Sequence, residues 1–323
     1  MKLRHLFFLL PLLLACGPLT EIGPTPAQIV LTHPPATAEP PEATQPAATA
    51  TPPVASAERA CAAGRSDQTN LTGHQMYRAY SNDGLHFEDE GQLLVDEASV
   101  PDGVIGPDGA LWLYFVNGIP GQHGIFAARE TVEGTFATID CISLDGAFEG
   151  NAVDPDLMRL PDGRFRLFYF LGAFVGERRP EALHTFYSAI SEDGLNFTIE
   201  GPIFEYEAIT DPSVAQLPNG EWLLAAARPG AGGALLARSS DGQSFTFQQE
   251  MGVDGIPELA VMPDGTVRLY LAQSYLSTDN GHTWIAETAG WIPSPDPSLV
   301  QLAPDSFVMF YKRIAGGPAA APP

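Results

Sequence analysis

The sequence predicts an all-β protein, because two hairpin signals alternate along most of the chain. The first is a Pro beside an acidic residue, followed six residues later by Pro-Asp-Gly or Pro-Asn-Gly and then by an apolar segment. The second is a Ser-x-Asp turn with a Gly, which ends in an aromatic residue three positions later. Gly and Asn tolerate positive φ, so such turns join antiparallel strands. The sequence contains no amphipathic helix of useful length.

The first signal occurs five times, and the last copy is one residue longer than the others. The copies open at Pro101-Asp102, Asp154-Pro155-Asp156, Asp211-Pro212-Ser213, Pro257-Glu258 and Asp296-Pro297-Ser298. Each copy predicts a strand, a tight turn and a second strand. The second strands are expected over residues 111–116, 164–170, 221–227, 266–271 and 307–311.

The second signal resembles the Asp box, which occurs in sialidases and in other β-propellers. There are four good copies and one degraded copy, and their aromatic residues are Phe87, Phe136, Phe197, Phe245 and Trp284. In this resemblance the Asp and the Gly form a hairpin turn, and the aromatic side chain packs between adjacent sheets. The motif therefore indicates architecture and says little about catalysis.

The spacing of these repeats predicts a five-bladed β-propeller. One four-stranded blade needs about 50 residues, which is close to the interval between successive aromatic positions. The chain begins with the second signal and ends with the first, so one blade is expected to be composite. Its inner strands would come from residues 298–312 and its outer strands from residues 75–94. The alternative, an open sandwich, does not need a regular repeat of this period.

The chain ends have a different composition from the repeats. Residues 1–15 are predicted to be a lipoprotein signal peptide, because a charged start and a short apolar run end in a lipobox-like Leu-Leu-Ala before Cys16. Cys16 would carry the lipid, and an ordinary secretory signal is the alternative. Residues 16–58 form a tether rich in Pro, Ala and Thr. The propeller is expected over residues 59–315, and residues 316–323 form a disordered tail.

The predicted signal implies export, so we expect a bacterial cell-surface or periplasmic lipoprotein. The net charge of −23, with 16 Lys and Arg against 39 Asp and Glu, argues against nucleic acid as a partner. Contact with the membrane is expected only through the lipid anchor, and we expect a monomer. Cys61 and Cys141 remain after lipidation, and in an oxidising compartment they are candidates for a disulfide.

Propeller topology sorts the acidic residues by face. Strand A of each blade lines the channel, and its start lies at one mouth. Acids on both sides of the Pro are two residues apart, so they are expected to point to the same side of an extended strand. The longer loops at this mouth would contribute further ligand-binding groups. The predicted substrate-binding residues are Asp156, Asp296, His123, His184, Arg228 and Trp291.

The five blades with acids at strand-A starts resemble the glycoside hydrolases of the arabinanase, β-xylosidase and α-L-arabinofuranosidase type. This resemblance implies that Asp211 tunes the site, Glu258 is the acid and Asp102 is the base, with Asp154 as the other candidate for the base. The family's base usually precedes a Pro, whereas Asp102 follows one. The family's Glu usually begins a Glu-Gly-Pro-like turn, and here the order is altered. Family members usually invert configuration.

The sequence thus predicts a surface-anchored glycoside hydrolase-like propeller that acts on oligo- or polysaccharides through carboxylate acid/base chemistry. One alternative is a catalytically silent propeller that binds glycans or proteins. A second is a sialidase-like exo-glycosidase, although such enzymes need an arginine triad and usually have six blades. No spacing of His, Cys and Asp has the specificity of a metal site, and no cofactor is expected. No motif supports a calcium ion in the channel.

Overall fold

The computed structural model describes residues 61, 71–172, 182–288 and 292–316. All of them belong to one compact unit, Ala55–Pro323. The predicted signal peptide, the lipidation site Cys16, the tether, and the tail beyond Gly316 lie outside the described residues. Nothing helical in the described ranges has the length and apolarity needed to cross a bilayer.

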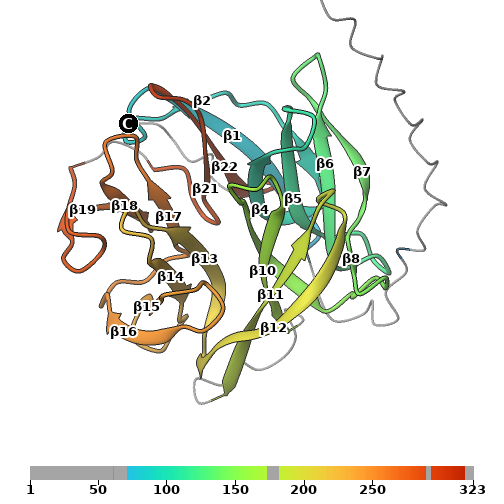
Figure 1. Cartoon of the computed structure of the whole chain (residues 1–323). Helices are drawn as coiled ribbons and strands as arrows, with labels where there is room; N and C mark the ends of the chain where they lie inside the picture. The colour runs from blue at the N-terminus through green and yellow to red at the C-terminus, as the bar shows by residue number, and fades with distance from the viewer. Residues whose placement is uncertain (1–60, 62–70, 173–181, 289–291, 317–323) are drawn as a thin grey trace, which may run out of the picture. The chain divides into compact units, whose positions relative to one another are not determined.

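Five antiparallel sheets make up the described part of the chain, and each is one blade (Figure 1). The first blade consists of β4 (Ala98–Ile105), β5 (Leu111–Asn117), β6 (Ile125–Glu130) and β7 (Phe136–Cys141). The second consists of β9 (Ala152–Arg159), β10 (Phe165–Leu171), β11 (Leu183–Ser191) and β12 (Asn196–Glu207), to which β8 (Ser143–Leu144) adds a parallel edge.

The third and fourth blades follow the same order of strands from the channel outward. The third consists of β13 (Thr210–Gln216), β14 (Trp222–Ala227), β15 (Leu235–Ser239) and β16 (Thr246–Glu250). The fourth consists of β17 (Glu258–Val261), β18 (Val267–Tyr270), β19 (Ser274–Ser277) and β20 (Ile285–Ala286).

The fifth blade joins the two ends of the described chain. Its inner strands are β21 (Ser298–Ala303) and β22 (Ser306–Ile314), and its outer strands are β1 (His74–Ser81), β2 (Glu88–Asp89) and β3 (Val95–Asp96). The register of β1 on β22 runs from His74 opposite Ile314 to Ser81 opposite Phe307. The predicted composite blade is therefore confirmed. This pairing covers sheet edges that would otherwise be open to other chains.

The inner strands form a closed ring. Each of β4, β9, β13, β17 and β21 contacts the next in this order, and β21 contacts β4. Because the ring closes with five sheets, the fold is the five-bladed β-propeller that the repeats predict. The inner strands thereby bring the Pro-containing openings of the five repeats together around one channel.

Aromatic side chains fill the space between neighbouring blades. Phe136 meets Phe310 of the fifth blade edge-to-face at 5.7 Å, and Phe87 meets Tyr270 of the fourth blade at 6.3 Å. The Tyr270 hydroxyl also donates a hydrogen bond to the carbonyl of Gly84 at 2.5 Å. Phe136 and Phe87 thus act as plugs between sheets, because each packs against a strand of an adjoining blade.

The acid of each complete Asp-box turn organises the turn around it. In the second blade, Asp193 Oδ1 accepts the backbone N–H groups of Leu195 and Asn196 at 2.9 and 2.8 Å, and it also accepts the Ser191 hydroxyl at 3.0 Å. These hydrogen bonds outweigh partial burial and lower the pKa of Asp193. The turns around Asp83, Asp241 and Asp279 repeat this pattern.

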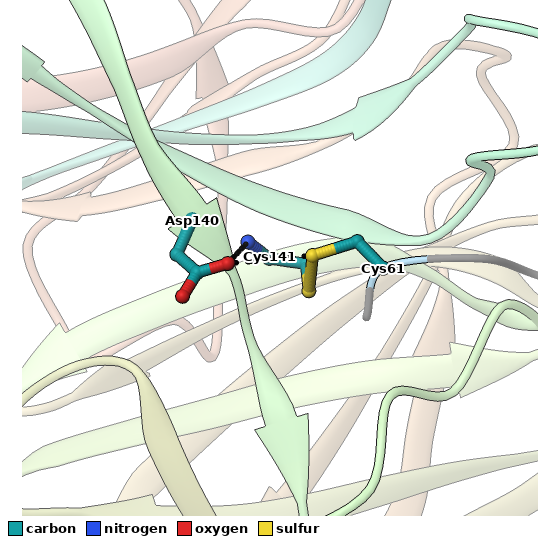
Figure 2. Close-up of side chains that lie close together, drawn as sticks. All are labelled: Cys61, Asp140 and Cys141. Atoms are coloured by element: carbon teal, nitrogen blue, oxygen red, sulfur yellow. Dashed lines mark hydrogen bonds between the residues drawn. A yellow bond between two sulfur atoms is a disulfide. The ribbon is translucent and has the colours of Figure 1, made fainter. Parts of the chain in front are cut away.

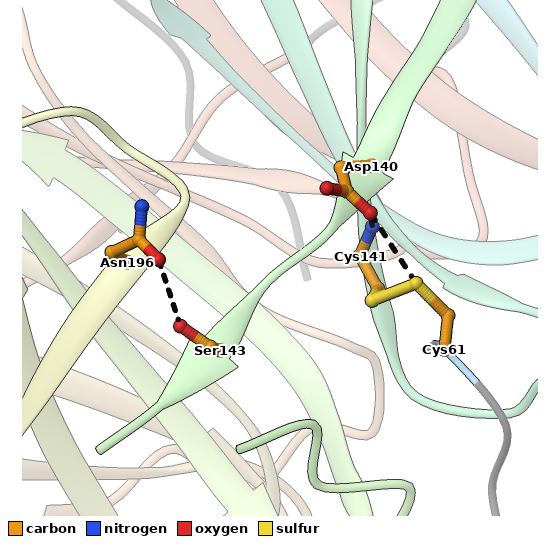
Figure 3. Close-up of a disulfide and its surroundings, with 5 residues drawn as sticks. All are labelled: Cys61, Asp140, Cys141, Ser143 and Asn196. Carbon is orange, nitrogen blue, oxygen red and sulfur yellow. Dashed lines mark hydrogen bonds between the residues drawn. A yellow bond between two sulfur atoms is a disulfide. The ribbon is translucent and has the colours of Figure 1, made fainter. Parts of the chain in front are cut away.

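A disulfide ties the start of the domain to the outer strand of the first blade. Cys61 and Cys141, the predicted pair, are bonded, with their Cα atoms 6.0 Å apart (Figure 2). Asp140 lies beside the bond and accepts the backbone N–H of Cys141 at 2.8 Å. Nearby, Ser143 of β8 donates a hydrogen bond to Asn196 of β12 at 3.1 Å (Figure 3). This second bond lies within the second blade, two residues along the chain from Cys141.

Candidate functional site at the channel mouth

Six acidic residues line one cavity at the starts of the inner strands. They are Asp102, Asp154, Asp156, Asp211, Glu258 and Asp296. The prolines of all five repeat openings line the same cavity. Its volume is about 20 Å³, which is room for about one water molecule. The structure thus gathers the predicted acids, and a larger ligand would meet them at the mouth.

The residues that follow the five prolines form a closed ring of hydrogen bonds. In each blade the side chain after the Pro accepts a backbone N–H from the inner strand of the next blade. The five links join Asp102 to Leu157 at 2.7 Å, Asp156 to Val214 at 3.0 Å, Ser213 to Leu259 at 2.9 Å, Glu258 to Leu299 at 2.8 Å and Ser298 to Gly103 at 3.0 Å. These side chains therefore hold the blades together around the channel.

Both oxygens of Asp102 and both oxygens of Glu258 are engaged in this ring. Besides the backbone links, Asp102 accepts the Ser298 hydroxyl at 2.8 Å, and Glu258 accepts the Ser213 hydroxyl at 3.0 Å. Burial raises the pKa of Asp102 to about 7, although these donors oppose the shift. Burial, together with the charge of Asp102, raises the pKa of Glu258 well above its usual range.

Asp156 is the third carboxyl in the ring. Burial is the main cause that raises its pKa well above the usual range, and the charges of Asp102 and Glu258 add to the effect. These three carboxyls also line a second cavity of about 230 Å³ further along the inner strands, which the other three acids do not reach. They therefore separate the mouth from the deeper channel.

The residues that precede the prolines lie differently from those that follow them. They are Val100, Asp154, Asp211, Ile256 and Asp296. Val100 and the three aspartates have φ between 50° and 55°, which is a left-handed conformation that costs free energy in residues other than Gly. The expectation that acids on both sides of a Pro share one side of an extended strand is wrong. The strand is not extended there, so the two positions reach different depths.

Asp154 and Asp211 are neighbours at the mouth. Asp154 is 4% exposed, and its Oδ2 accepts the backbone N–H of Asp211 at 3.2 Å. Its Oδ1 has no hydrogen-bond partner among the described residues. Burial and the negative charge of Asp211 raise the pKa of Asp154 well above its usual range. A buried carboxyl beside another acid retains its proton and can donate it to a ligand.

Two residues that the sequence analysis did not select complete this end of the channel. Lys312 of β22 lies with its Nζ 2.5 Å from Asp296 Oδ2. His74 of β1 contacts the Ser99 hydroxyl through Nδ1 at 2.9 Å. Burial lowers the pKa of His74, and Lys312 lowers it further. The sequence does single out Lys312, because the chain contains only one other lysine, Lys2.

Three of the predicted substrate-binding residues, His123, His184 and Arg228, do not line the mouth cavity. His184 contacts the Ile209 carbonyl through Nδ1 at 2.7 Å and packs 5.0 Å from the ring of Phe170. His123 is buried, and this burial lowers its pKa. Trp291 lies outside the described residues.

Arg228 is also engaged within the protein. It forms an ion pair with Glu250 at 2.5 Å and lies over the ring of Tyr206 at 5.1 Å. Its guanidinium therefore already has a charged partner and an aromatic face. No arginine lines the mouth cavity in the described part of the chain, so the arginine triad that a sialidase needs has no counterpart there.

Within the described ranges, one group of His, Cys, Asp and Glu side chains has the close spacing of metal ligands. It consists of Cys61, Asp140 and Cys141, and it lies at the disulfide rather than at the channel (Figure 2). Since the two sulfur atoms are bonded to each other, they are not thiolate ligands.

Comparison with solved structures finds proteins that are similar to this chain in fold. Scans against models of protein families and against curated proteins find no match. An α-L-arabinofuranosidase of Fusarium graminearum is 16% identical, covering 70% of this chain and 80% of its own, with a TM-score of 0.48. A family 117 glycoside hydrolase of Zobellia galactanivorans is 12% identical, covering 75% and 91%, with a TM-score of 0.49. An α-L-arabinanase of Penicillium chrysogenum is 14% identical, covering 74% and 98%, with a TM-score of 0.42.

Proposed function

We propose that the domain acts on glycosidic bonds of oligo- or polysaccharides, with Asp154 and Asp211 as its working carboxylates. One observation carries this proposal: Asp154 is buried beside Asp211, and one of its oxygens has no hydrogen-bond partner among the described residues. A buried polar atom without a partner is costly. A hydroxyl or glycosidic oxygen of a ligand at the mouth would provide one.

The chemistry needs one protonated and one ionised carboxyl. Two adjacent acids divide a single proton between them, because ionising both is unfavourable. Asp154, whose pKa is raised, would protonate the oxygen of the leaving sugar as the C–O bond breaks. Asp211, as the ionised partner, would stabilise the positive charge that develops at the anomeric carbon while a water attacks that carbon. The water releases a proton to solvent and Asp154 regains one from solvent, so both carboxyls return to their starting state.

This assignment differs from the one that the family resemblance implies. Asp102 and Glu258 were expected to be the base and the acid, but all four of their oxygens accept hydrogen bonds within the blade ring. A substrate would have to share these oxygens with donors that already hold them in the ring. Asp211 stays in the site, and Asp154 replaces Asp102 and Glu258 as its partner.

A panel of aryl glycosides and oligosaccharides tests the proposal. Asp154→Asn and Asp211→Asn should each lower turnover by about 100-fold or more, with unchanged thermal unfolding. Asp264→Asn is the matched control, because Asp264 is an exposed turn residue far from the channel mouth. Equal activity in all three variants would refute the assignment of Asp154 and Asp211.

The second candidate is a catalytically silent propeller that binds glycans or proteins, and a specific observation favours it. Apolar Val100 occupies the position before the Pro in the first blade, where the glycoside hydrolases that this sequence resembles usually carry their base. No turnover on any glycoside, combined with ligand binding that Asp154→Asn weakens, would favour this function over hydrolysis.

We also propose that the protein is exported and lipid-anchored through Cys16, that its partner is carbohydrate, and that it is monomeric. The support is the lipobox-like sequence before Cys16 and the tether that follows it. Labelling of cells with a palmitate analogue should mark the wild type and not a Cys16→Ala variant. Light scattering of the domain should give the mass of one chain.

A further inference from the structure

The carboxyl of Asp296 is buried, and one cation balances it. Asp296 is 1% exposed. Neither of its carboxylate oxygens accepts a hydrogen bond from any of the described residues. Its Oδ2 nevertheless lies 2.5 Å from Lys312 Nζ, so the contact is an ion pair without hydrogen-bond geometry. A buried carboxylate without a cation would take up a proton. Within the described residues, Lys312 is thus the cation that pairs with this buried carboxylate.

This ion pair lies in the neighbourhood of the proposed working carboxyls. Asp296 lines the same cavity as Asp154 and Asp211, and it comes from the blade that closes the ring. The charges of both Asp296 and Lys312 act on Asp154. His74 of β1 faces the same pair, and because burial and Lys312 lower its pKa it is neutral at pH 7.

We propose that Asp296, held by its ion pair with Lys312 in the cavity that Asp154 also lines, is a positioning residue of this site that keeps the proton on Asp154. This inference rests on the proposed function, in which Asp154 is the proton donor. The inference gives the composite fifth blade a role in the site, whereas Asp154 and Asp211 come from the second and third blades.

The opposing charges of the pair do not cancel at Asp154. Burial and the charge of Asp211 are the main causes of its raised pKa, the backbone N–H of Asp211 opposes them, the charge of Asp296 adds to them, and the charge of Lys312 opposes them. Asp296 lines the cavity together with Asp154, whereas Lys312 does not. Replacing Asp296 by a neutral residue removes a negative charge and leaves the positive charge of Lys312 in place. Both changes favour the ionised form of Asp154, so Asp154 should lose its proton at lower pH.

Carbon-detected NMR titration of the side-chain carboxyls of the whole domain tests this inference, with the Asp154 signal assigned from its loss in Asp154→Asn. In Asp296→Asn the Asp154 midpoint should move to lower pH. In Lys312→Met the ion pair with Asp296 is lost, so the Asp154 midpoint should differ from that of the wild type. Lys312→Arg retains the charge and should leave the wild-type midpoint unchanged.

An unchanged Asp154 midpoint in a folded Asp296→Asn variant would overturn the inference. If that variant does not fold, the comparison of Lys312→Met with Lys312→Arg decides, because a merely structural lysine gives equal midpoints in both. The titration needs no substrate. A shifted midpoint in a protein that turns over no glycoside would therefore refute the proposed hydrolysis while this charge coupling stands.

Discussion

The carboxylate of Asp102 accepts the backbone N–H of Leu157, a residue of the next blade, at 2.7 Å. The same relationship recurs at all five blade boundaries, with Asp, Glu or Ser as the acceptor. Since the fifth link returns to the strand that carries Asp102, the ring closes on itself. The hydrogen bonds therefore stabilise the two boundaries of the composite fifth blade as well as the boundaries between the other blades.

Breaking one link should destabilise the whole ring. Asp102→Ala leaves the Leu157 N–H and the Ser298 hydroxyl without an acceptor in a buried place. Each unsatisfied group costs about 1–3 kcal/mol, so we expect a loss of about 2–5 kcal/mol in urea unfolding. Asp102→Asn retains an oxygen acceptor and should lose much less. Equal losses in the two variants would show that the hydrogen bonds contribute little.

The ring should make the stability of the domain fall as pH rises from about 4 to about 7. The folded-state pKa of Asp102 is raised to about 7, and those of Asp156 and Glu258 are raised as well. Their unfolded values are about 4. The folded protein therefore binds more protons, and its extra stability is full below about pH 4 and is lost as pH rises through about 7.

Urea unfolding between pH 4 and pH 8 checks this dependence, and the expected fall is on the order of a few kcal/mol. Asp102→Asn removes one of the titrating groups and should flatten the curve. The exposed turn acids, such as Asp241, have lowered pKa values and favour folding at higher pH. Stability that rises steadily from pH 4 to pH 8 would contradict the prediction.

The Asp-box turns should matter for stability and not for the mouth. Asp193→Ala removes an acceptor of two backbone N–H groups and of the Ser191 hydroxyl, so we expect a loss of about 1–2 kcal/mol in thermal unfolding. Its exposed neighbour Glu192 provides the matched control, Glu192→Ala, which should cost little. Ligand binding or turnover by the folded Asp193→Ala protein should equal that of the wild type.

Reduction of the disulfide should destabilise the domain. The bond joins residues 80 positions apart, and constraining a loop of that length in the unfolded chain is worth about 4 kcal/mol. Strand β1 lies within this loop. A force that pulls on the chain before Cys61 is therefore transmitted through the disulfide to Cys141 in β7, and it does not separate β1 from its partner strand β22. Urea unfolding with and without reductant measures the effect.

A Cys61→Ser/Cys141→Ser variant controls for that experiment. It should unfold at the lower urea concentration of the reduced wild type, and reductant should not change its midpoint. If reductant shifts both proteins alike, the effect does not come from the bond between Cys61 and Cys141.

Much of the fold could be predicted from the sequence, because propeller repeats carry their own local signals. The turn residues, the aromatic plugs and the spacing give the hairpins and the blade count, and the order of the two signals gives the composite blade. The gathering of the six acids at one mouth follows from the topology. The blade ring could not be found in this way, because its links join residues far apart in sequence, such as Ser298 and Gly103.

The sequence by itself determined the five-bladed architecture, the closure of the ring and the acidic mouth, since these depend on turn chemistry and repeat order. Only the tertiary structure decided which acids hold the blades together and which, like Asp154, keep an oxygen without a hydrogen-bond partner among the described residues. The reason is the backbone conformation before the prolines. The residues that precede four of the five prolines, such as Asp154, have a left-handed conformation. This conformation breaks the alternation of side chains that an extended strand would have. The tertiary structure also placed Lys312 beside Asp296, a contact that no sequence pattern encodes.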